Sequence, residues 1–237
     1  MRKTYSKSLT VVVPCYNEQK TIGKVVSIIK KSLKISKIFN YEIIIVNDAS
    51  TDKTINELNK IKEKKLKIVN NYKNLGLGKS VIKGYKLAKG KYCMYVPGDN
   101  THPVQGLVMI LKKINFLEEE LIIPYVKDNR SRHFLRVLLS SIFTITVNFL
   151  FNLKIPYYNS LAVYPVSKIK KIKKVNGDFS FQAQLIIILI KKFRLHYKFV
   201  GTIIKENKEF FSNAVRLKNI LLVIKSIIRL NFNFNKK

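Results

Sequence analysis

The sequence predicts an α/β fold with a mostly parallel sheet that is covered by helices on both faces. Two β-branched runs, at 10–13 and 42–46, each stop at a polar, turn-forming cluster, as buried parallel strands often do. Segments with helical periodicity follow both runs, and strands that alternate with helices are typical of a parallel, doubly covered sheet. No linker or repeat divides the 237 residues, so we expect one domain over 1–237, with halves at 1–125 and 126–237.

Short apolar runs and the periodic segments between them give the order of the elements. Four strands are expected, at 10–13, 42–46, 67–70 and 92–96. Helices are expected at 20–38, at 54–62 and through Tyr85 and Ala88. Because the carboxyl ends of parallel strands meet at one edge of a sheet, the polar clusters after these strands should together form a ligand site.

The amino terminus and the cysteines indicate the compartment. No apolar stretch with a small-residue cleavage site opens the sequence, so we expect no signal peptide and a cytoplasmic chain. Cys15 and Cys93 lie in strand-like surroundings and are expected to be reduced core residues.

The formal charge of +31 indicates a polyanionic partner: nucleic acid, an anionic membrane surface or a phosphorylated ligand. Most of the lysines are equally well explained as solvated surface residues that bind no partner. Arginine is more informative, because three of the seven arginines, Arg130, Arg132 and Arg136, fall in one short segment, and guanidinium groups match phosphate geometry. No helix-turn-helix, zinc-finger or RNP-like motif accompanies the charge, so no nucleic acid is expected as a partner.

Four motifs in the first half resemble those of the family-two glycosyltransferases with the GT-A fold. Within that family they look most like the polyprenyl-phosphate sugar synthases typified by dolichol-phosphate mannosyltransferase. The second half resembles them only loosely. The motifs are Pro14-Cys15-Tyr16-Asn17-Glu18, Asn47-Asp48-Ala49-Ser50-Thr51-Asp52, Asn74-Leu75-Gly76-Leu77-Gly78-Lys79 and Gly98-Asp99.

The resemblance implies an inverting transfer of a sugar from a UDP- or GDP-linked donor to a polyprenyl phosphate. Glu18 would accept hydrogen bonds from ribose hydroxyls and Asp48 would bind the base, although the family more often has two acids where this chain has Asn47 and Asp48. Glycines at 76 and 78 would let the backbone approach the donor. The donor-binding residues implied are Pro14, Tyr16, Glu18, Asp48, Gly76, Gly78 and Lys79. Further along the chain, Arg216, with Lys205 and Lys208, is expected to contact the donor diphosphate, and an ordinary basic loop before a helix is an equal alternative.

The resemblance also implies a divalent metal, Mg²⁺ or Mn²⁺, held by an Asp-x-Asp motif at the end of the fourth strand. Here Pro97 replaces the first acid and only Asp99 remains. We therefore expect weakened metal binding through Asp99. Loss of metal dependence, loss of activity, and a plain turn without a ligand role stay open as alternatives.

The second half, 126–237, is expected to hold the acceptor and to associate with a membrane. Arg130, Arg132, Arg136 and Ser140 would bind the acceptor phosphate, with Arg136 and Ser140 on one helical face, and Gln182 belongs to a Phe-Gln pair that resembles one in the lipid-phosphate synthases. Asp99, Arg136 and Ser140 are the predicted catalytic residues. One alternative is a polysaccharide hydroxyl as acceptor with Asp178 as base, and another is a degenerate binding or scaffold protein.

Two segments favour peripheral attachment to the inner face of a membrane. The stretch 134–153 is long enough to span a bilayer, but polar residues recur at every fourth position, from Arg136 to Asn152. An interfacial helix fits better than a span, and a helix in the protein core is a near-equal alternative. The second segment, 217–230, forms a basic amphipathic pattern, with Leu221, Ile224, Ile227 and Ile228 on one face.

Overall fold

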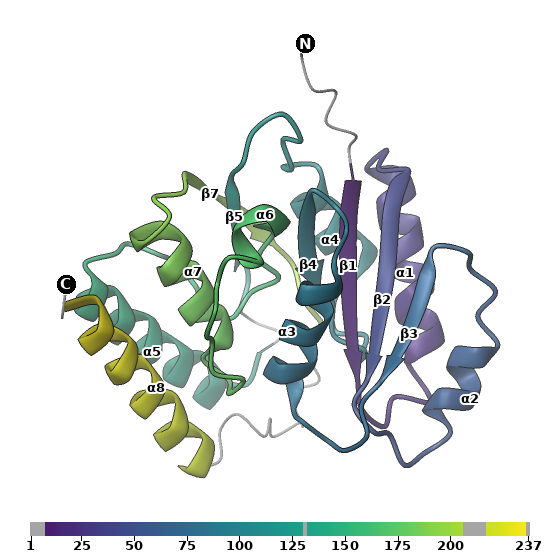
Figure 1. The fold of residues 1–237 in the computed structure, drawn as a ribbon, viewed down its shortest axis with the longest axis horizontal. Helices are drawn as coiled ribbons and strands as arrows, with labels where there is room; N and C mark the ends of the chain where they lie inside the picture. The colour runs from purple at the N-terminus through teal and green to yellow at the C-terminus, as the bar shows by residue number, and fades with distance from the viewer. Residues whose placement is uncertain (1–7, 130–131, 206–216, 236–237) are drawn as a thin grey trace.

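A computed structural model describes residues 8–129, 132–205 and 217–235 of the chain. The polypeptide forms an α/β domain with helices on both faces of its main sheet and a further group of helices beside the sheet (Figure 1). The strands are β1 (Ser8–Cys15), β2 (Asn40–Asn47), β3 (Leu66–Asn70), β4 (Tyr92–Tyr95), β5 (Leu121–Val126), β6 (Tyr164–Pro165) and β7 (Tyr197–Thr202). The helices are α1 (Ile22–Ile35), α2 (Thr54–Asn59), α3 (Leu77–Leu87), α4 (Val104–Leu111), α5 (Phe134–Phe151), α6 (Val166–Ile169), α7 (Phe181–Lys191) and α8 (Leu217–Asn235).

The main sheet has the strand order β3-β2-β1-β4-β6. The first four strands are parallel and only β6 runs the other way. The chain order reverses between β1 and β4, and the crevice beyond the carboxyl ends of two such strands is where open α/β sheets bind ligands. All four predicted strands are confirmed, each within two residues of its expected ends.

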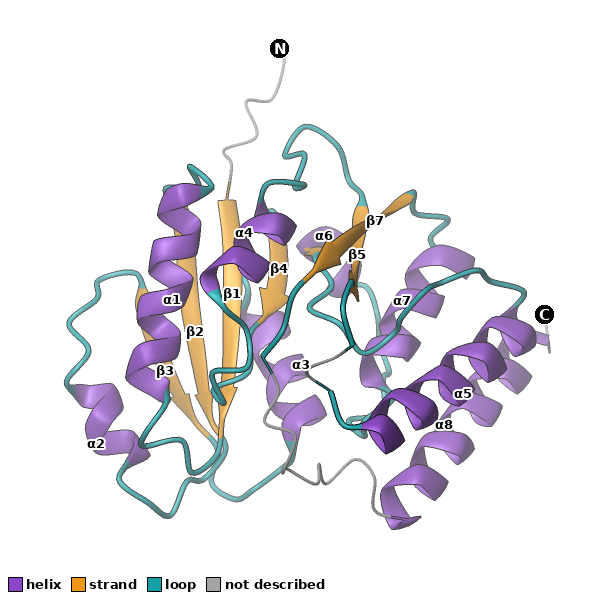
Figure 2. Ribbon diagram, turned by 180° about the vertical axis from the view of Figure 1, so that it is seen from behind, coloured by secondary structure: helices purple, strands orange, loops and turns teal. Residues whose placement is uncertain are grey.

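Helices cover both faces of the sheet, as predicted. α3 lies on one face, and α1 and α4 lie on the other, where they also contact each other (Figures 1 and 2). Two of the three predicted helices are shorter than expected. The first ends at Ile35 because Lys37 adopts a φ of 55° and breaks the helical path, and the second ends at Asn59.

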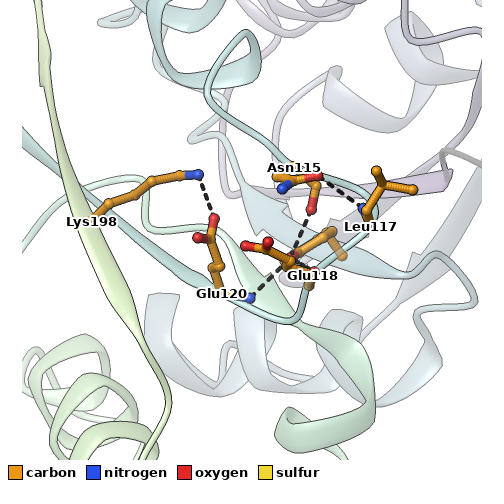
Figure 3. Close-up of polar contacts among 6 residues, drawn as sticks. Asn115, Leu117, Glu118, Glu120 and Lys198 are labelled. Carbon is orange, nitrogen blue, oxygen red and sulfur yellow. Dashed lines mark hydrogen bonds and ion pairs between the residues drawn. The ribbon is translucent and has the colours of Figure 1, made fainter.

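A second sheet of two parallel strands, β5 and β7, joins the end of the first half to the second half, and the sequence did not predict it. The loop before β5 is fixed by its own polar contacts, which Figure 3 shows. Asn115 Oδ1 accepts from the backbone N–H of Leu117 at 3.0 Å, and an ion pair from Lys198 to Glu120 joins β7 to the start of β5. The ion pair therefore links the amino-terminal ends of β5 and β7.

Helices α5 and α8 lie side by side at the edge of the molecule, away from the β3 edge of the sheet (Figures 1 and 2). The rings of Phe151 and Phe234 pack edge to face, with centroids 6.1 Å apart. The α5 side chains that face the protein are buried at Thr144, Val147 and Phe151. Asn148 on this side bonds the backbone N–H and C=O of Ile155.

The opposite face of α5 is apolar and exposed, with Ile145 at 68% and Phe149 at 86% exposure. This helix of 18 residues has a mean hydropathy of 1.8, enough by length and composition to cross a membrane, and only 11% of it is buried. The alternative of a core helix is therefore wrong. In α8 the predicted apolar face is divided, because Ile227 points inward while Leu221, Ile224 and Ile228 are exposed.

Candidate functional site

The loops that follow β1 and β2 are joined by hydrogen bonds between side chains and backbone. Asn17 Oδ1 accepts from the backbone N–H of Thr51 at 2.8 Å, and the Ser50 hydroxyl accepts from the backbone N–H of Asn17 at 3.0 Å. The Glu18 N–H donates to the Thr54 hydroxyl at 2.8 Å. The first two predicted motifs thus form one ordered rim, from which the ring of Tyr16 projects with 46% exposure.

Asp48 ties the third motif to this rim. The side chain is 4% exposed, and its Oδ1 accepts from the backbone N–H of Leu75 at 2.9 Å and from the Asn71 amide at 2.7 Å. Its Oδ2 accepts from the backbone N–H of Gly76 at 2.8 Å. Asp48 therefore orders the loop that was expected to approach the donor, a role that its spacing in the sequence did not reveal.

Asn71 was missed in the sequence, although it completes this network. Its amide donates to the hydroxyl of Ser80 at 2.9 Å as well as to Asp48, and its Oδ1 accepts from Lys83 Nζ at 2.6 Å. Asn47, which stands where the family more often has an acid, donates to Asn70 Oδ1 at 3.0 Å and accepts from the Ser50 N–H at 3.2 Å. The side chains of both asparagines therefore stabilise turns through hydrogen bonds.

The two glycines of the third motif are required for different structural reasons. Gly76 has a φ of 87°, a backbone conformation that residues with a side chain rarely adopt, and it directly precedes the first residue of α3. Gly78 is buried against the backbone of the segment before α7, because a Cβ at this position would lie 2.6 Å from the carbonyl oxygen of Gly177. Lys79, the next residue, has an exposed side chain at the start of α3.

The loop after β4 lies directly against the β1 rim. The N–H of Gly98 donates to the carbonyl of Pro14 at 3.1 Å, and a Cβ on Gly98 would lie 3.3 Å from Glu18 Cγ. Asp99 is exposed, and its Oδ1 accepts from the N–H and the hydroxyl of Thr101 at 3.1 and 2.8 Å. Asp99 and Glu18 are thus neighbours at the switch point of the sheet.

Burial raises the pKa of Glu18 above its ordinary value, the hydroxyl of Thr21 opposes this, and the charge of Asp99 adds to it. Burial lowers the pKa of His102 to about 4, so this ring is neutral at pH 7. Within the described ranges, no three His, Cys, Asp or Glu side chains are arranged to hold a metal ion. A cation bound beside Asp99 would therefore need most of its ligands from groups other than these side chains.

The predicted arginine cluster begins at the amino-terminal end of α5. Arg132 is 7% exposed, its Nη1 donates to Asn129 Oδ1 and its Nη2 to the hydroxyl of Tyr157, both at 3.1 Å. Its guanidinium carbon lies 5.2 Å from the centroid of the Tyr157 ring. Tyr157 was missed because it lies 25 residues further along the chain.

Tyr95, at the end of β4, contacts a second predicted residue, and it too was missed. Nε2 of Gln182 donates to its hydroxyl at 2.8 Å. Burial raises the pKa of Tyr95, Tyr157 and Asp99 raise it further, and the charge of Arg136 opposes them. Through this hydrogen bond the end of β4 is joined to the start of α7.

The remaining predicted residues lie on α5, near the Asp99 loop, or outside the described part of the chain. Ser140 is half-buried on α5, and its hydroxyl donates to the carbonyl of Val137 in the same helix at 2.9 Å. Arg130, Lys208 and Arg216 lie outside the described residues. Lys205, at the end of the described segment after β7, donates its N–H to the Thr101 carbonyl at 2.9 Å, beside the Asp99 loop.

Asp178, the alternative base, is engaged in a buried polar network. Its Oδ1 accepts from the N–H and the hydroxyl of Ser180 at 2.8 and 2.5 Å, and its Oδ2 accepts from the hydroxyl of Ser226 at 2.5 Å. Asn176 also donates to Ser226, at 3.0 Å. Asp178 therefore connects the start of α7 to α8.

Comparisons with known proteins agree with this arrangement. The family model described as Glycosyl transferase family 2 matches residues 10–172, which is more than half of the chain. The dodecaprenyl-phosphate galacturonate synthase of Rhizobium johnstonii is 26% identical over 172 residues, covering 71% of this chain and 51% of that protein. The dolichol-phosphate mannosyltransferase of Pyrococcus furiosus is 30% identical over 107 residues, covering 45% and 30%. The chain thus spans about half or less of the length of these two relatives.

A similar fold occurs in the crystal structure of glucosyl-3-phosphoglycerate synthase from Mycobacterium tuberculosis in complex with Mn²⁺, UDP and phosphoglyceric acid. The TM-score is 0.70 with 13% identity, over 96% of this chain and 78% of that one. At this identity the likeness concerns the fold alone, and it agrees with the predicted GT-A architecture. The family match and the motifs at the switch point lead to one conclusion: this chain belongs to glycosyl transferase family 2.

Proposed function

We propose that this protein transfers a sugar from a nucleotide-sugar to a polyprenyl phosphate, with inversion at the anomeric carbon. One observation carries the proposal: Arg132 lies just before α5 and Arg136 lies in its first turn, and the outer face of this helix is apolar and exposed. A phosphate-binding group beside an apolar surface suits a ligand with an anionic head and a hydrocarbon chain. The names of the relatives, which include dodecaprenyl and dolichol phosphate transferases, support this choice.

The rim formed by the loops after β1, β2 and β3 is the proposed donor site. Glu18 would accept from the ribose, and the N-terminal end of α3, where Gly76, Gly78 and Lys79 lie, would face the diphosphate. Both oxygens of Asp48 are bonded to the loop before α3, so Asp48 would shape the donor site through that loop instead of binding the base itself. The position of this rim at the switch point of the sheet supports the assignment.

A divalent cation fits this site only as a partner of the bound diphosphate. Mg²⁺ is commonly held by one or two carboxylates, substrate phosphates and water, and Asp99 is an exposed carboxylate at the required place. The cation, Mg²⁺ or Mn²⁺, would neutralise charge on the departing nucleoside diphosphate. Pro97 cannot contribute a ligand, so we expect weak binding of free metal.

The acceptor phosphate would be held by Arg136 and Arg132. A phosphate monoester is already anionic at pH 7, so its oxygen attacks the anomeric carbon without a base, and the bond from that carbon to the donor diphosphate breaks. The two hydrogen-bonded oxygens of Asp178 disfavour the alternative of a hydroxyl acceptor that Asp178 deprotonates. Ser140 would complete the acceptor site from the same face of α5.

The exposed faces of α5 and α8 would rest in the interface of an anionic membrane, on its cytoplasmic side. The apolar side chains of α5 that supply this contact are Leu138, Ile142, Ile145 and Phe149, and those of α8 are Leu221, Ile224, Ile228 and Phe232. Lys225 and Arg229 of α8 are exposed beside them and match anionic headgroups. This placement would bring the head of a membrane-embedded lipid to the start of α5.

The proposal is tested by release of nucleoside diphosphate from a panel of UDP- and GDP-sugars, with and without undecaprenyl phosphate and with Mg²⁺ or Mn²⁺. Arg136→Gln is compared with Arg194→Gln, which removes the same charge from the exposed residue beyond the far end of α7. Release that requires the lipid, falls at least about tenfold in Arg136→Gln and persists in Arg194→Gln supports the proposal. Lipid-independent release, or equal loss in both variants, contradicts it.

A further inference from the structure

The segment before α7 lies directly against the first turn of α3, where the donor diphosphate is proposed to bind. A Cβ on Gly177 would overlap Cγ of Lys79 and lie 3.1 Å from the Lys79 backbone nitrogen. In the other direction, a Cβ on Gly78 would lie 2.6 Å from the Gly177 carbonyl oxygen and 3.0 Å from that of Asp178. The stem of the Lys79 side chain therefore passes over the Gly177 backbone, and no further side chain fits between the two segments.

Both neighbours of Gly177 are anchored to α7 by hydrogen bonds. The Asn176 N–H donates to Gln184 Oε1 at 3.0 Å, and Oδ1 of Asp178 accepts from the N–H of Ser180 at 2.8 Å. Gln184 is itself fixed, because its amide donates to the Ser180 hydroxyl at 2.7 Å, and both side chains are buried. The backbone at Gly177 therefore has little freedom to move away from α3.

Helix α8 holds the same segment through one hydroxyl group. Ser226, in the middle of this helix, donates to Asp178 Oδ2 at 2.5 Å and accepts from the Asn176 amide at 3.0 Å. Ser226 is buried together with Ile227, although other apolar side chains of α8 are exposed. A side chain of α8 thus contacts the residues on both sides of Gly177, and Gly177 contacts the first turn of α3.

We propose that Ser226 and Asp178 are positioning residues for the donor diphosphate: they hold Gly177 in place, and Gly177 holds the Lys79 side chain and the first turn of α3 where the diphosphate binds. The inference rests on the proposed function, and it gives α8, the helix proposed to lie on the membrane, a part in donor binding. A lysine ammonium and the N–H groups at a helix N-terminus both bind phosphate oxygens. A shift of this turn should therefore affect the diphosphate and not the nucleoside.

The test compares a nucleoside diphosphate with its nucleoside, UDP with uridine and GDP with guanosine, because only the diphosphate reaches the turn in question. Dissociation constants are measured with Mg²⁺ for the wild type, Ser226→Ala, Asp178→Ala and Gly177→Ala, with Ser32→Ala as the matched control. Ser32 is also buried, and its hydroxyl donates to the Ile28 carbonyl at 2.8 Å, but it lies on α1, on the opposite face of the sheet from α3. Thermal unfolding verifies that each variant is folded.

Ser226→Ala should weaken binding of the diphosphate by about threefold to tenfold and leave nucleoside binding unchanged, since a residue that acts through others carries only part of the interaction. Asp178→Ala should show at least the same loss. Gly177→Ala should weaken diphosphate binding by about tenfold, because the new methyl group displaces the Lys79 stem and a hydrogen bond to a charged group is lost.

The control Ser32→Ala should bind all four compounds as the wild type does. Unchanged diphosphate binding in a folded Ser226→Ala protein, or an equal loss of diphosphate and nucleoside binding, overturns the inference. Wild-type protein that binds neither diphosphate more tightly than its nucleoside overturns the proposed donor site as well.

Discussion

The carboxylate of Asp48 accepts a hydrogen bond of 2.8 Å from the backbone N–H of Gly76, and this bond joins the loops that follow β2 and β3. Asp48 also accepts from Leu75 and Asn71, so one side chain orders the whole turn before α3. Because Asp48 is 4% exposed, its removal would leave the N–H groups of Leu75, Gly76 and the Asn71 amide without an acceptor and shielded from water.

Asp48→Ala should lower the free energy of unfolding by about 1–3 kcal/mol, the usual cost of unsatisfied buried groups. The same change should weaken UDP binding, because the loop that faces the proposed donor loses its anchor. Urea unfolding and calorimetric titration with UDP measure the two effects. Glu118→Ala, which removes an exposed carboxylate, should change stability by less than about 0.5 kcal/mol. Equal stability of the two variants would contradict the role given to Asp48.

Gly78→Ala should destabilise the protein, since the new Cβ would lie 2.6 Å from the Gly177 carbonyl oxygen and must push α3 away from the segment before α7. We expect a loss of about 1–3 kcal/mol, as for other overpacked sites. Gly23→Ala is the control within α1, where a Cβ meets nothing within 4 Å. That change should be neutral or stabilise by up to about 1 kcal/mol. Denaturant midpoints that rank the two variants the other way would refute this packing argument.

The ion pair between Lys30 and Glu63, at 2.6 Å, predicts a dependence of stability on pH. The hydrogen bond from Lys30 holds the pKa of Glu63 below its ordinary value. A lowered pKa in the folded state means that the pair stabilises the protein above the unfolded pKa, near 4.5, and that this contribution disappears as the pH falls through the folded pKa.

Glu63→Gln should therefore reduce stability at pH 7 by at most about 1 kcal/mol, because the pair is partly exposed and screened by salt. The difference from the wild type should shrink below pH 4.5 and in high salt. Urea unfolding at several pH values measures it, and the Lys30→Met variant should show the same dependence. A difference that grows as the pH falls would be inconsistent with the ion pair.

Substitution of Ile145 and Phe149 by Ser should weaken binding to vesicles that contain phosphatidylglycerol. Both side chains are exposed on α5, so their loss should leave the folded protein intact while removing apolar area from the membrane contact. Each is expected to contribute roughly tenfold in partitioning. Leu117→Ser is the control, since Leu117 is 80% exposed in the loop before β5, and this loop lies away from α5 and α8 (Figures 1 and 2). Equal binding by all three proteins in co-sedimentation would exclude α5 as the contact.

The strands and loops of the first half could be predicted because their signals are local. β1, β2 and β4 are apolar runs that end in turn-forming residues, and parallel pairing brings those turns to one edge. β6 is only two residues long, and its pairing with β4 comes from contacts distant in sequence. Nothing in a pattern read along the chain distinguishes such a segment from a loop.

The same limit applies to the site. The sequence singled out Gln182, but Tyr95, whose hydroxyl accepts from the Gln182 amide, looked like one more apolar strand residue. The spacing of Arg136, Ser140 and Asn148 predicted one polar face on α5, yet could not say whether that face pointed to solvent or to protein. The structure answers this, since Asn148 bonds to Ile155 and the apolar face is the exposed one.

The most direct test of the proposed function is transfer of radiolabelled sugar into the lipid phase, with undecaprenyl phosphate compared with undecaprenol in the same detergent. The account predicts transfer to undecaprenyl phosphate alone, with the sugar attached through the phosphate, because Arg132 and Arg136 are proposed to bind an anionic head and a phosphate oxygen needs no base. Equal or faster transfer to undecaprenol, lost in Asp178→Asn, would contradict the account and favour a hydroxyl acceptor.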